Sequence, residues 1–197
     1  MILIFVSTVL IGLLGFVWYV LSPRTKVVST VPSEWKGVLN RQVLFYRNLN
    51  AQQKCQFESD VYNFLNHVTI TGVKVNVDLT DRLLVASSAV IPLFGFPQWT
   101  YAHLEEVLLY PGSFDQQYNV GSPNATISGM VGNGPLEGKV IISKPALHKG
   151  FEITNDKKNV GIHEFVHLFD KEDGLIDALP PGYQTDHFIA PWLALIS

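Results

Sequence analysis

The amino-acid sequence predicts an α+β domain that follows an apolar N-terminal segment. Helical spacing of apolar residues dominates residues 33–93, and short apolar runs bounded by glycine or proline come later in the chain. No internal repeat and no regular alternation of strands and helices is visible, which favours α+β over α/β. Of the 197 residues, 47% are hydrophobic. The chain is therefore long and apolar enough for one globular domain with a core.

Residues 1–21 form an apolar segment without a single charged residue. As a helix they would be about 30 Å long, which is the thickness of the hydrocarbon core of a membrane. Trp18 and Tyr19 stand near its end, where interfacial aromatic residues are expected. No basic residue precedes Arg24, so the segment lacks the basic start of a cleaved signal peptide. We therefore expect a retained transmembrane anchor rather than a cleaved signal or a buried core helix.

The arrangement of charges around this segment predicts a topology. All the flanking cations follow it, and the positive-inside rule then places the main domain in the cytoplasm. The expected organisation is an anchor over residues 1–21, a linker over residues 22–32 and a globular domain over residues 33–197. The expected location is the membrane, with a single pass.

Each later segment has its own pattern. Residues 33–67 carry apolar side chains three and four apart, which predicts amphipathic helices with a break near residues 48–50. Residues 68–77 alternate apolar and polar side chains, which predicts a strand. Residues 81–93 are too continuously apolar for a surface helix and predict a buried one. The remaining predictions are two short strands, at residues 107–110 and 139–142, and a long loop or hairpin between them at residues 112–138.

Composition excludes several classes of function. The formal net charge is -3, so no basic field is present to hold nucleic acid. The single cysteine, Cys55, excludes an internal disulfide, and its helical surroundings predict a buried small hydrophobic residue rather than a nucleophile. Because cysteine ligands are lacking, a metal site has to use histidines and carboxylates.

The sequence HEFVH at residues 163–167 carries the chemistry. On a helix, His163 and His167 lie one turn apart on the same face, so both imidazoles can reach one zinc ion at about 2.0–2.1 Å. Glu164 lies beside that face, where it can take a proton from a water that the metal activates and later pass it to a leaving amine. Alternatively, the two histidines are packed or solvated side chains. Apolar neighbours nearly all round predict that residues 160–169 form a buried helix, in which unpartnered polar groups are costly.

The motif NVGIHEFVHLFDKEDGLIDALPP at residues 159–181 resembles the Mlc titration factor A family of zinc peptidases. The upstream stretches LLVASSAVIPLFGF, LEEVLLYPGSF and VIIS are similar too, so the resemblance spans residues 34–181. It implies an aminopeptidase-like zinc enzyme with a zincin-like domain, in which a helix with the HExxH motif lies against a small sheet. It also implies that His163 and His167 are metal ligands and that Glu164 is the catalytic base. Residues 129–134 are expected to form a strand edge beside this helix, where a peptide substrate could pair.

The chain departs from this family in two ways. Family members are soluble, and their third zinc ligand is a glutamate on a later helix. After His167 the only glutamate in the sequence is Glu172, which falls on a different helix face. We therefore expect a C-terminally truncated fragment whose third ligand lies beyond Ser197 and which binds zinc weakly. Within the chain, His187 and four aspartates could replace this third ligand: Asp170, Asp173, Asp177 and Asp186. Asp170 is the least expected of them.

Three functions compete at this point. The first is a zinc metallopeptidase that hydrolyses peptides or proteins. The second, implied by the resemblance, is a regulatory binding protein that retains the fold and sequesters a transcriptional repressor. The third is a structural membrane-anchored domain without activity. The intact HExxH motif favours the first, because a pure binding protein has no physical need for Glu164.

Overall fold

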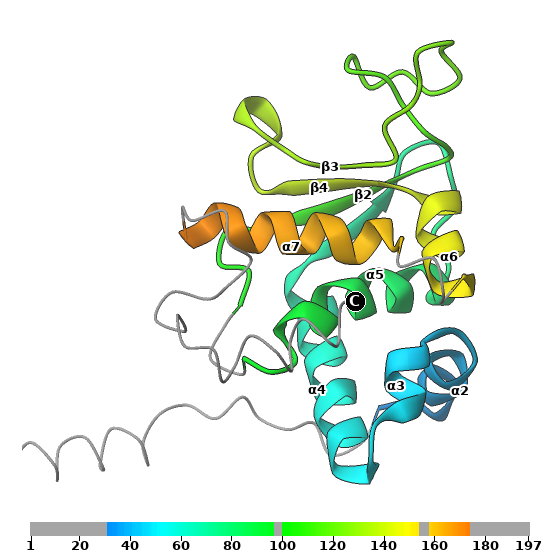
Figure 1. Cartoon of the computed structure of the whole chain (residues 1–197), viewed down its shortest axis with the longest axis vertical. Coiled ribbons are helices and arrows are strands. Elements are labelled where there is room, and N and C mark those ends of the chain that lie inside the picture. Colours follow the sequence, from blue (N-terminus) through cyan, green and yellow to red (C-terminus); the bar gives the residue numbers. More distant parts are fainter. Residues whose placement is uncertain (1–30, 97–99, 154–157, 174–197) are drawn as a thin grey trace, which may run out of the picture.

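The computed structural model describes residues 31–96, 100–153 and 158–173. In this part of the chain, a four-stranded sheet packs with one face against helices (Figure 1). The mixed α and β composition predicted from the sequence is confirmed. In chain order the elements are α2 (Ser33–Gln42), α3 (Leu44–Asn48), α4 (Ala51–His67), β1 (Thr69–Gly72), α5 (Leu79–Leu93), β2 (Glu106–Tyr110), β3 (Gly129–Val131), the 3-10 helix η1 (Gly134–Leu136), β4 (Lys139–Ser143), α6 (Lys144–Glu152) and α7 (Val160–Asp173).

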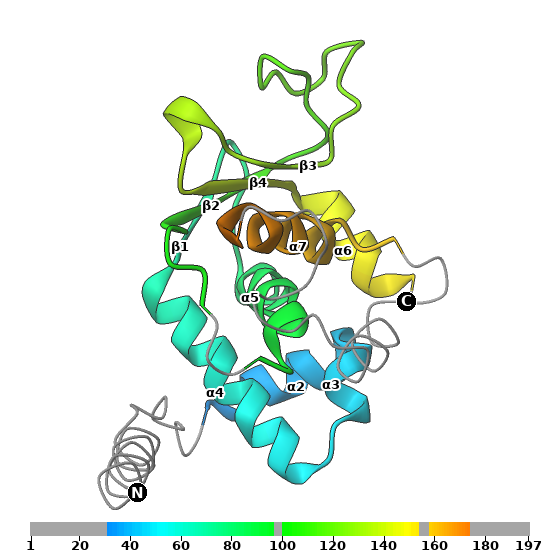
Figure 2. The same cartoon turned by 60° about the vertical axis from the view of Figure 1, so that its left-hand side comes forward.

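The helices α2, α3 and the first turns of α4 lie at the end of the molecule away from the sheet (Figure 2). The predicted break near residues 48–50 is confirmed, because Asn50 starts α4 with a capping box. Its side chain accepts a hydrogen bond from the Gln53 backbone N–H at 2.9 Å, and the Gln53 side chain accepts one from the Asn50 N–H at 3.0 Å. A second break, not predicted, falls at Val43, which is extended and fully buried.

The sheet has the order β1-β2-β4-β3. The pairs β1–β2 and β2–β4 are parallel, whereas β3 runs antiparallel to β4 and lies at the edge. The strands predicted at residues 107–110 and 139–142 are confirmed as β2 and β4. The strand predicted over residues 68–77 is too long: β1 ends at Gly72. Lys74 has a φ of 58°, in the left-handed region, and turns the chain away from the sheet.

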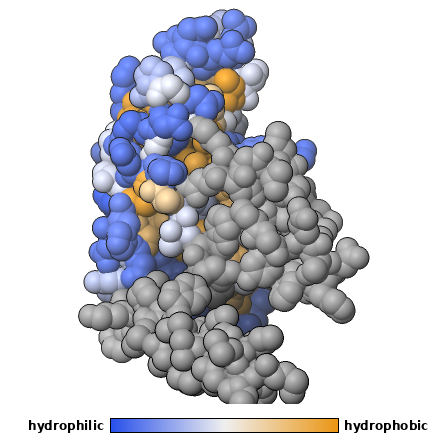
Figure 3. All heavy atoms as spheres, turned by 90° about the vertical axis from the view of Figure 1, so that its left-hand side faces the viewer, coloured by the Kyte–Doolittle hydropathy of each residue, from blue (hydrophilic) through white to orange (hydrophobic). Residues whose placement is uncertain are grey.

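The main core lies between the sheet and the helices. The predicted buried helix is confirmed as α5, whose residues 83–92 are all buried. Because side chains alternate along a strand, Val140 and Ile142 of β4 enter this core, while Ile141 joins Tyr110 and Phe114 in a smaller cluster on the other face. On the side of the molecule that Figure 3 presents, hydrophobic atoms are also exposed between hydrophilic ones.

The prediction that Cys55 is buried is wrong, because the structure places this thiol on the exposed face of α4. Phe57, Glu58 and Val61 form the buried face of that helix, and Cys55 lies on the side away from them. The anchor predicted over residues 1–21 lies outside the described residues, as does the linker apart from Val31 and Pro32. Among the described helices, none is both long and apolar enough to cross a bilayer.

Candidate active site

The start of α7 is fixed by Asn159. Its side-chain oxygen accepts a hydrogen bond from the Ile162 N–H at 3.0 Å, as a helix N-cap does, and its amide donates to the carbonyl of Gly150 in α6 at 3.1 Å. The next turn packs closely, because a Cβ at Gly161 would collide with the Ser88 hydroxyl of α5 and with Leu147 of α6. The first turn of α7 is therefore locked between α5 and α6.

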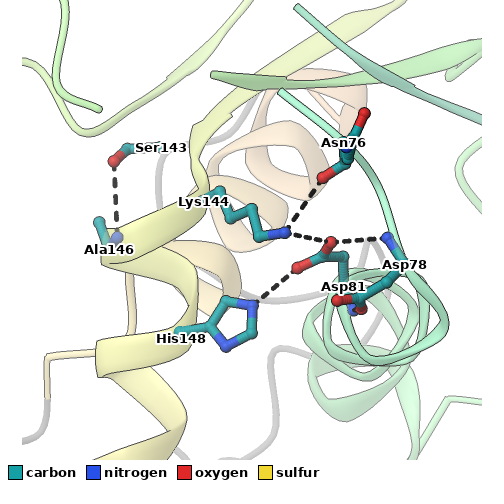
Figure 4. Close-up of polar contacts among 7 residues, drawn as sticks. All are labelled: Asn76, Asp78, Asp81, Ser143, Lys144, Ala146 and His148. Carbon is teal, nitrogen blue, oxygen red and sulfur yellow. Dashed lines mark hydrogen bonds and ion pairs between the residues drawn. The ribbon is translucent and has the colours of Figure 1, made fainter. Parts of the chain in front are cut away.

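Helix α6 is itself tied to α5 by a buried carboxylate (Figure 4). Asp81 is fully buried and accepts hydrogen bonds from Lys144 Nζ and His148 Nε2, each at 2.7 Å. Lys144 also donates to the carbonyl of Asn76 at 3.0 Å. Burial alone would raise the pKa of Asp81, but the hydrogen bonds from His148, Lys144 and the Asp78 backbone outweigh it and lower that pKa below its ordinary value. This cluster supports the helix against which α7 begins.

The rings of His163 and His167 come together on the exposed face of α7. Their Nε2 atoms are 2.9 Å apart, so one ring nitrogen donates a hydrogen bond to the other. Partial burial, and then the neighbouring His167, lower the pKa of His163. The predicted helix is confirmed by α7, and so is the convergence of the two rings. The expectation of a helix buried nearly all round holds for one face only, because both histidines are exposed while Phe165 and Leu168 face the core.

Of the three polar residues of the motif, Glu164 is the buried one, at 7% exposure. It faces the edge strand: a Cβ built on Gly129 of β3 would lie 2.6 Å from Glu164 Oε1 and 2.8 Å from Val160 Cγ2. Burial raises the pKa of Glu164 to about 7. The carboxyl group is thus held in a narrow space between α7 and β3, with a proton affinity suited to exchange near neutral pH.

The strand edge expected beside the helix is present as β3. Within the described residues β3 pairs on one side only, with β4, and Gly129 lies opposite Ile142. The other side of β3 offers backbone N–H and C=O groups to an extended peptide. The expectation extended to residue 134, but the strand ends at Val131 and the chain then turns into η1.

The two histidines fit a zinc ion. Zinc binds imidazole nitrogen at about 2.0–2.1 Å with tetrahedral angles, so two such nitrogens lie roughly 3.3 Å apart around it. The observed 2.9 Å between the Nε2 atoms requires only a small opening of the pair. Residues 31–96, 100–153 and 158–173 contain no group of three histidine, cysteine or carboxylate side chains that could hold a metal.

The possible third ligands named from the sequence have different places in the structure. Asp170 is buried in α7, three residues after His167. Glu172 and Asp173 fall in the last turn of α7, where the backbone alone is described. Asp177, Asp186 and His187 lie outside the described residues. Of the expected ligand set, the described residues therefore bring His163 and His167 together.

A cavity elsewhere in the described part of the chain is separate from this site. It has a volume of about 610 Å³ and lies between α4, α5 and the segment before β2, with Asp60, Phe64, Leu93 and Tyr101 in its wall. Neither His163 nor His167 lines it. Phe165 packs against Phe64 and Tyr101, so the cavity lies behind the buried face of α7. The cavity is therefore a feature distinct from the histidine pair.

Two features of the site were missed from the sequence. The first is the contact of Gly129 with Glu164, which depends on strand pairing that a local pattern does not carry. The second is the cluster around Asp81. The spacing of four residues between Lys144 and His148, on one helix face, was an available signal of a shared partner.

A helix with the HExxH motif beside an antiparallel edge strand defines a metallopeptidase class of site. Comparison with known proteins gives the family. The model of the glucose-regulated metallo-peptidase M90 family matches residues 22–197, and the chain belongs to this family. The resemblance to the Mlc titration factor A family predicted from the sequence is thereby confirmed. The chain is also similar to a protein of Synechocystis sp. (strain ATCC 27184 / PCC 6803 / Kazusa) described as uncharacterized protein slr2042, with 28% identity over 196 residues that cover 92% of this chain and 70% of that protein.

Proposed function

We propose that this protein is a zinc-dependent peptidase in which His163 and His167 hold the metal and Glu164 is the general base. The observation that carries the proposal is the position of Glu164. Its carboxyl group is buried beside the edge strand, while the ring nitrogens of His163 and His167 converge on the exposed face of the same helix. Family membership supports a metal and a peptide or protein substrate.

Each residue has a stated task in the reaction. A zinc ion supplies a Lewis acid that polarises the substrate carbonyl and activates a water molecule. Glu164 accepts the proton of the attacking water and donates it to the leaving amine, and a pKa of about 7 suits both transfers near neutral pH. The free side of β3 binds the substrate backbone in an extended conformation. Asn159 and Gly161 keep α7 in place while this happens.

Three finer assignments complete the proposal. The cleavage mode and the third ligand follow from the resemblance, and the anchor follows from the uncharged apolar sequence of residues 1–21. We propose aminopeptidase-like cleavage, which peptides with free and acetylated N-termini test directly, since only the free form would be cut. We also propose that residues 1–21 anchor the protein in a membrane with the domain on the cytoplasmic side. The third zinc ligand is proposed to be a carboxylate outside the described residues.

The experiment that tests the proposed function compares Glu164→Gln with the wild-type protein. We expect kcat for a fluorogenic peptide to fall by about 100-fold or more, because general acid–base catalysis contributes about 10²–10⁴-fold, while zinc content stays the same. Glu152→Gln, an exposed carboxylate at the end of α6, is the matched control. The alternative, a regulatory protein that binds a transcriptional repressor, predicts that Glu164→Gln leaves function intact. Undiminished hydrolysis in Glu164→Gln would refute the assigned base.

A further inference from the structure

The charges of this chain are divided sharply along the sequence. Residues 22–57 contain six lysines and arginines and one acidic residue, Glu34. Residues 58–197 contain eight lysines and arginines and sixteen acidic residues. The overall charge of -3 therefore hides a basic first part and an acidic remainder. Such an asymmetry is an electrostatic feature of the surface rather than a requirement of the fold.

The structure gathers the described part of this basic stretch at one end. Arg41 ends α2 and Arg47 lies in α3, and both side chains are exposed. Neither forms an ion pair within the described residues, whereas Lys36 is 3.0 Å from Glu58. Lys54 of α4 lies over the ring of Tyr46, with 5.2 Å between Nζ and the ring centroid. We call this end, formed by α2, α3 and the first turns of α4, the basic end.

An apolar side chain stands among these cations. Leu44 is 38% exposed at the start of α3, and it shares a helix face with Arg47 three residues later. Exposed leucine beside arginine is the composition of surfaces that enter the boundary between lipid headgroups and acyl chains. The basic end lies opposite the sheet, and β3 is at the far end of the molecule (Figures 1 and 2).

We propose that the basic end docks on an anionic lipid surface, with Leu44 entering the headgroup region and Arg41 and Arg47 binding lipid phosphates. The apolar run at residues 1–21 directly precedes the basic stretch, residues 22–57, in the sequence. Docking in this orientation turns the edge strand β3 away from the lipid (Figures 1 and 2). That last consequence rests on the proposed peptidase function, whereas the docking itself does not.

Electrostatics set the size of the effect. Each lysine or arginine close to an anionic membrane strengthens binding by about 1 kcal/mol, which is roughly fivefold. Loss of both exposed arginines should therefore weaken docking by about 25-fold. The acidic remainder of the chain is repelled by the same surface, which fixes the orientation as well as the affinity. A nucleic acid is a poorer candidate, because the whole chain is negatively charged and the basic end has few cations.

The only cysteine of the chain provides the test. Cys55 is exposed on α4, within the basic end, and can be labelled with an environment-sensitive fluorophore in the full-length protein. The labelled protein is mixed with vesicles of phosphatidylcholine alone, or with about 30% phosphatidylserine, that carry a quencher at the headgroup. We expect quenching with the anionic vesicles only, and its loss in high salt. The control label is placed at the opposite end, on Asn124→Cys in a Cys55→Ser background, and should remain unquenched.

Charge variants complete the experiment. Arg41→Gln combined with Arg47→Gln should raise the phosphatidylserine content needed for quenching, and the affinity for vesicles should fall about 25-fold. The matched pair Lys74→Gln and Lys149→Gln removes the same charge from exposed positions elsewhere and should have little effect. Equal quenching with neutral and anionic vesicles would overturn the proposal. So would quenching of the control label instead of Cys55, or binding of an RNA homopolymer without any effect of vesicles.

Discussion

Gly129 and Glu164 touch so closely that no other residue fits at position 129 without moving the glutamate. A Cβ there would lie 2.6 Å from Oε1 and 2.7 Å from Cγ of Glu164. The absence of a side chain in the edge strand therefore sets the position of the proposed base. Helix α7 can approach β3 closely only because of this glycine.

The substitution Gly129→Ala tests this relationship. We expect kcat to fall by about tenfold or more, because displacement of a catalytic group by about 1 Å is costly, while zinc affinity changes less. The control is Gly112→Ala, where the added Cβ would meet only Val120 at 3.6 Å, an ordinary contact. Full activity in Gly129→Ala, with a fold as stable as that of the control, would show that the contact does not position Glu164.

The cluster around Asp81 predicts a loss of stability. Asp81→Asn removes the negative charge and replaces one of the two acceptor oxygens with an NH2 donor, so Lys144 or His148 loses its acceptor. We expect the free energy of unfolding to fall by roughly 2–4 kcal/mol at pH 7. Asp78→Asn is the matched control, because asparagine caps a helix about as well as aspartate and the change should be small. Denaturant unfolding measures both variants.

The pH dependence of that effect has a defined sign. The pKa of Asp81 is lowered in the folded protein, so its contribution is present above the ordinary value and is lost as the pH falls through the folded pKa. The difference between wild type and Asp81→Asn should therefore shrink in acid, below about pH 4. A difference that stays constant from pH 7 to acid would contradict a charged Asp81 as its origin.

The contribution of Asp60 to stability should have the opposite pH dependence. Burial raises its pKa to about 6, and the hydrogen bond from Gln56 offsets only part of that rise. Its contribution to stability is therefore present at low pH and is lost as the pH rises through about 6. We expect Asp60→Asn to be more stable than wild type at pH 7.5 by about 1 kcal/mol, and not at pH 4.5.

Thermal unfolding at the two pH values measures this effect, with the exposed Glu152→Gln as the reference for loss of a carboxylate. If Asp60→Asn destabilised the protein equally at both pH values, ionisation of the buried carboxyl group would not be the cause of the stability lost at the higher pH.

The sequence and the structure agree best where the signal is local. The helix with His163 and His167 could be predicted because the four-residue spacing and the apolar flanks both belong to one segment. The buried helix α5 could be predicted for the same reason, because its continuous apolar run has no polar face to turn toward solvent. Local periodicity also led to a wrong prediction, since helical surroundings alone did not reveal that Cys55 lies on the outer face of α4.

Long-range geometry could not be predicted in the same way. The parallel order of β1, β2 and β4 depends on pairing between segments that are far apart, and strands of four or five residues carry little information on their partners. The edge position of β3 was expected, but its contact with Glu164 required the packing of α7 against the sheet. The third metal ligand stays a prediction outside the described residues.

The affinity of the protein for zinc tests the central claim most directly. Competition with a chromophoric chelator measures it in the wild type, in His163→Ala, in His167→Ala and in His67→Ala, an exposed histidine of α4. If the pair whose Nε2 atoms lie 2.9 Å apart holds the metal, His163→Ala and His167→Ala should each lower the affinity for zinc by about 100-fold or more. This loss exceeds the 10–100-fold that follows when a residue hydrogen-bonded to a metal ligand is changed. His67→Ala should bind zinc like the wild type. Unchanged zinc affinity in His163→Ala and His167→Ala would contradict the account.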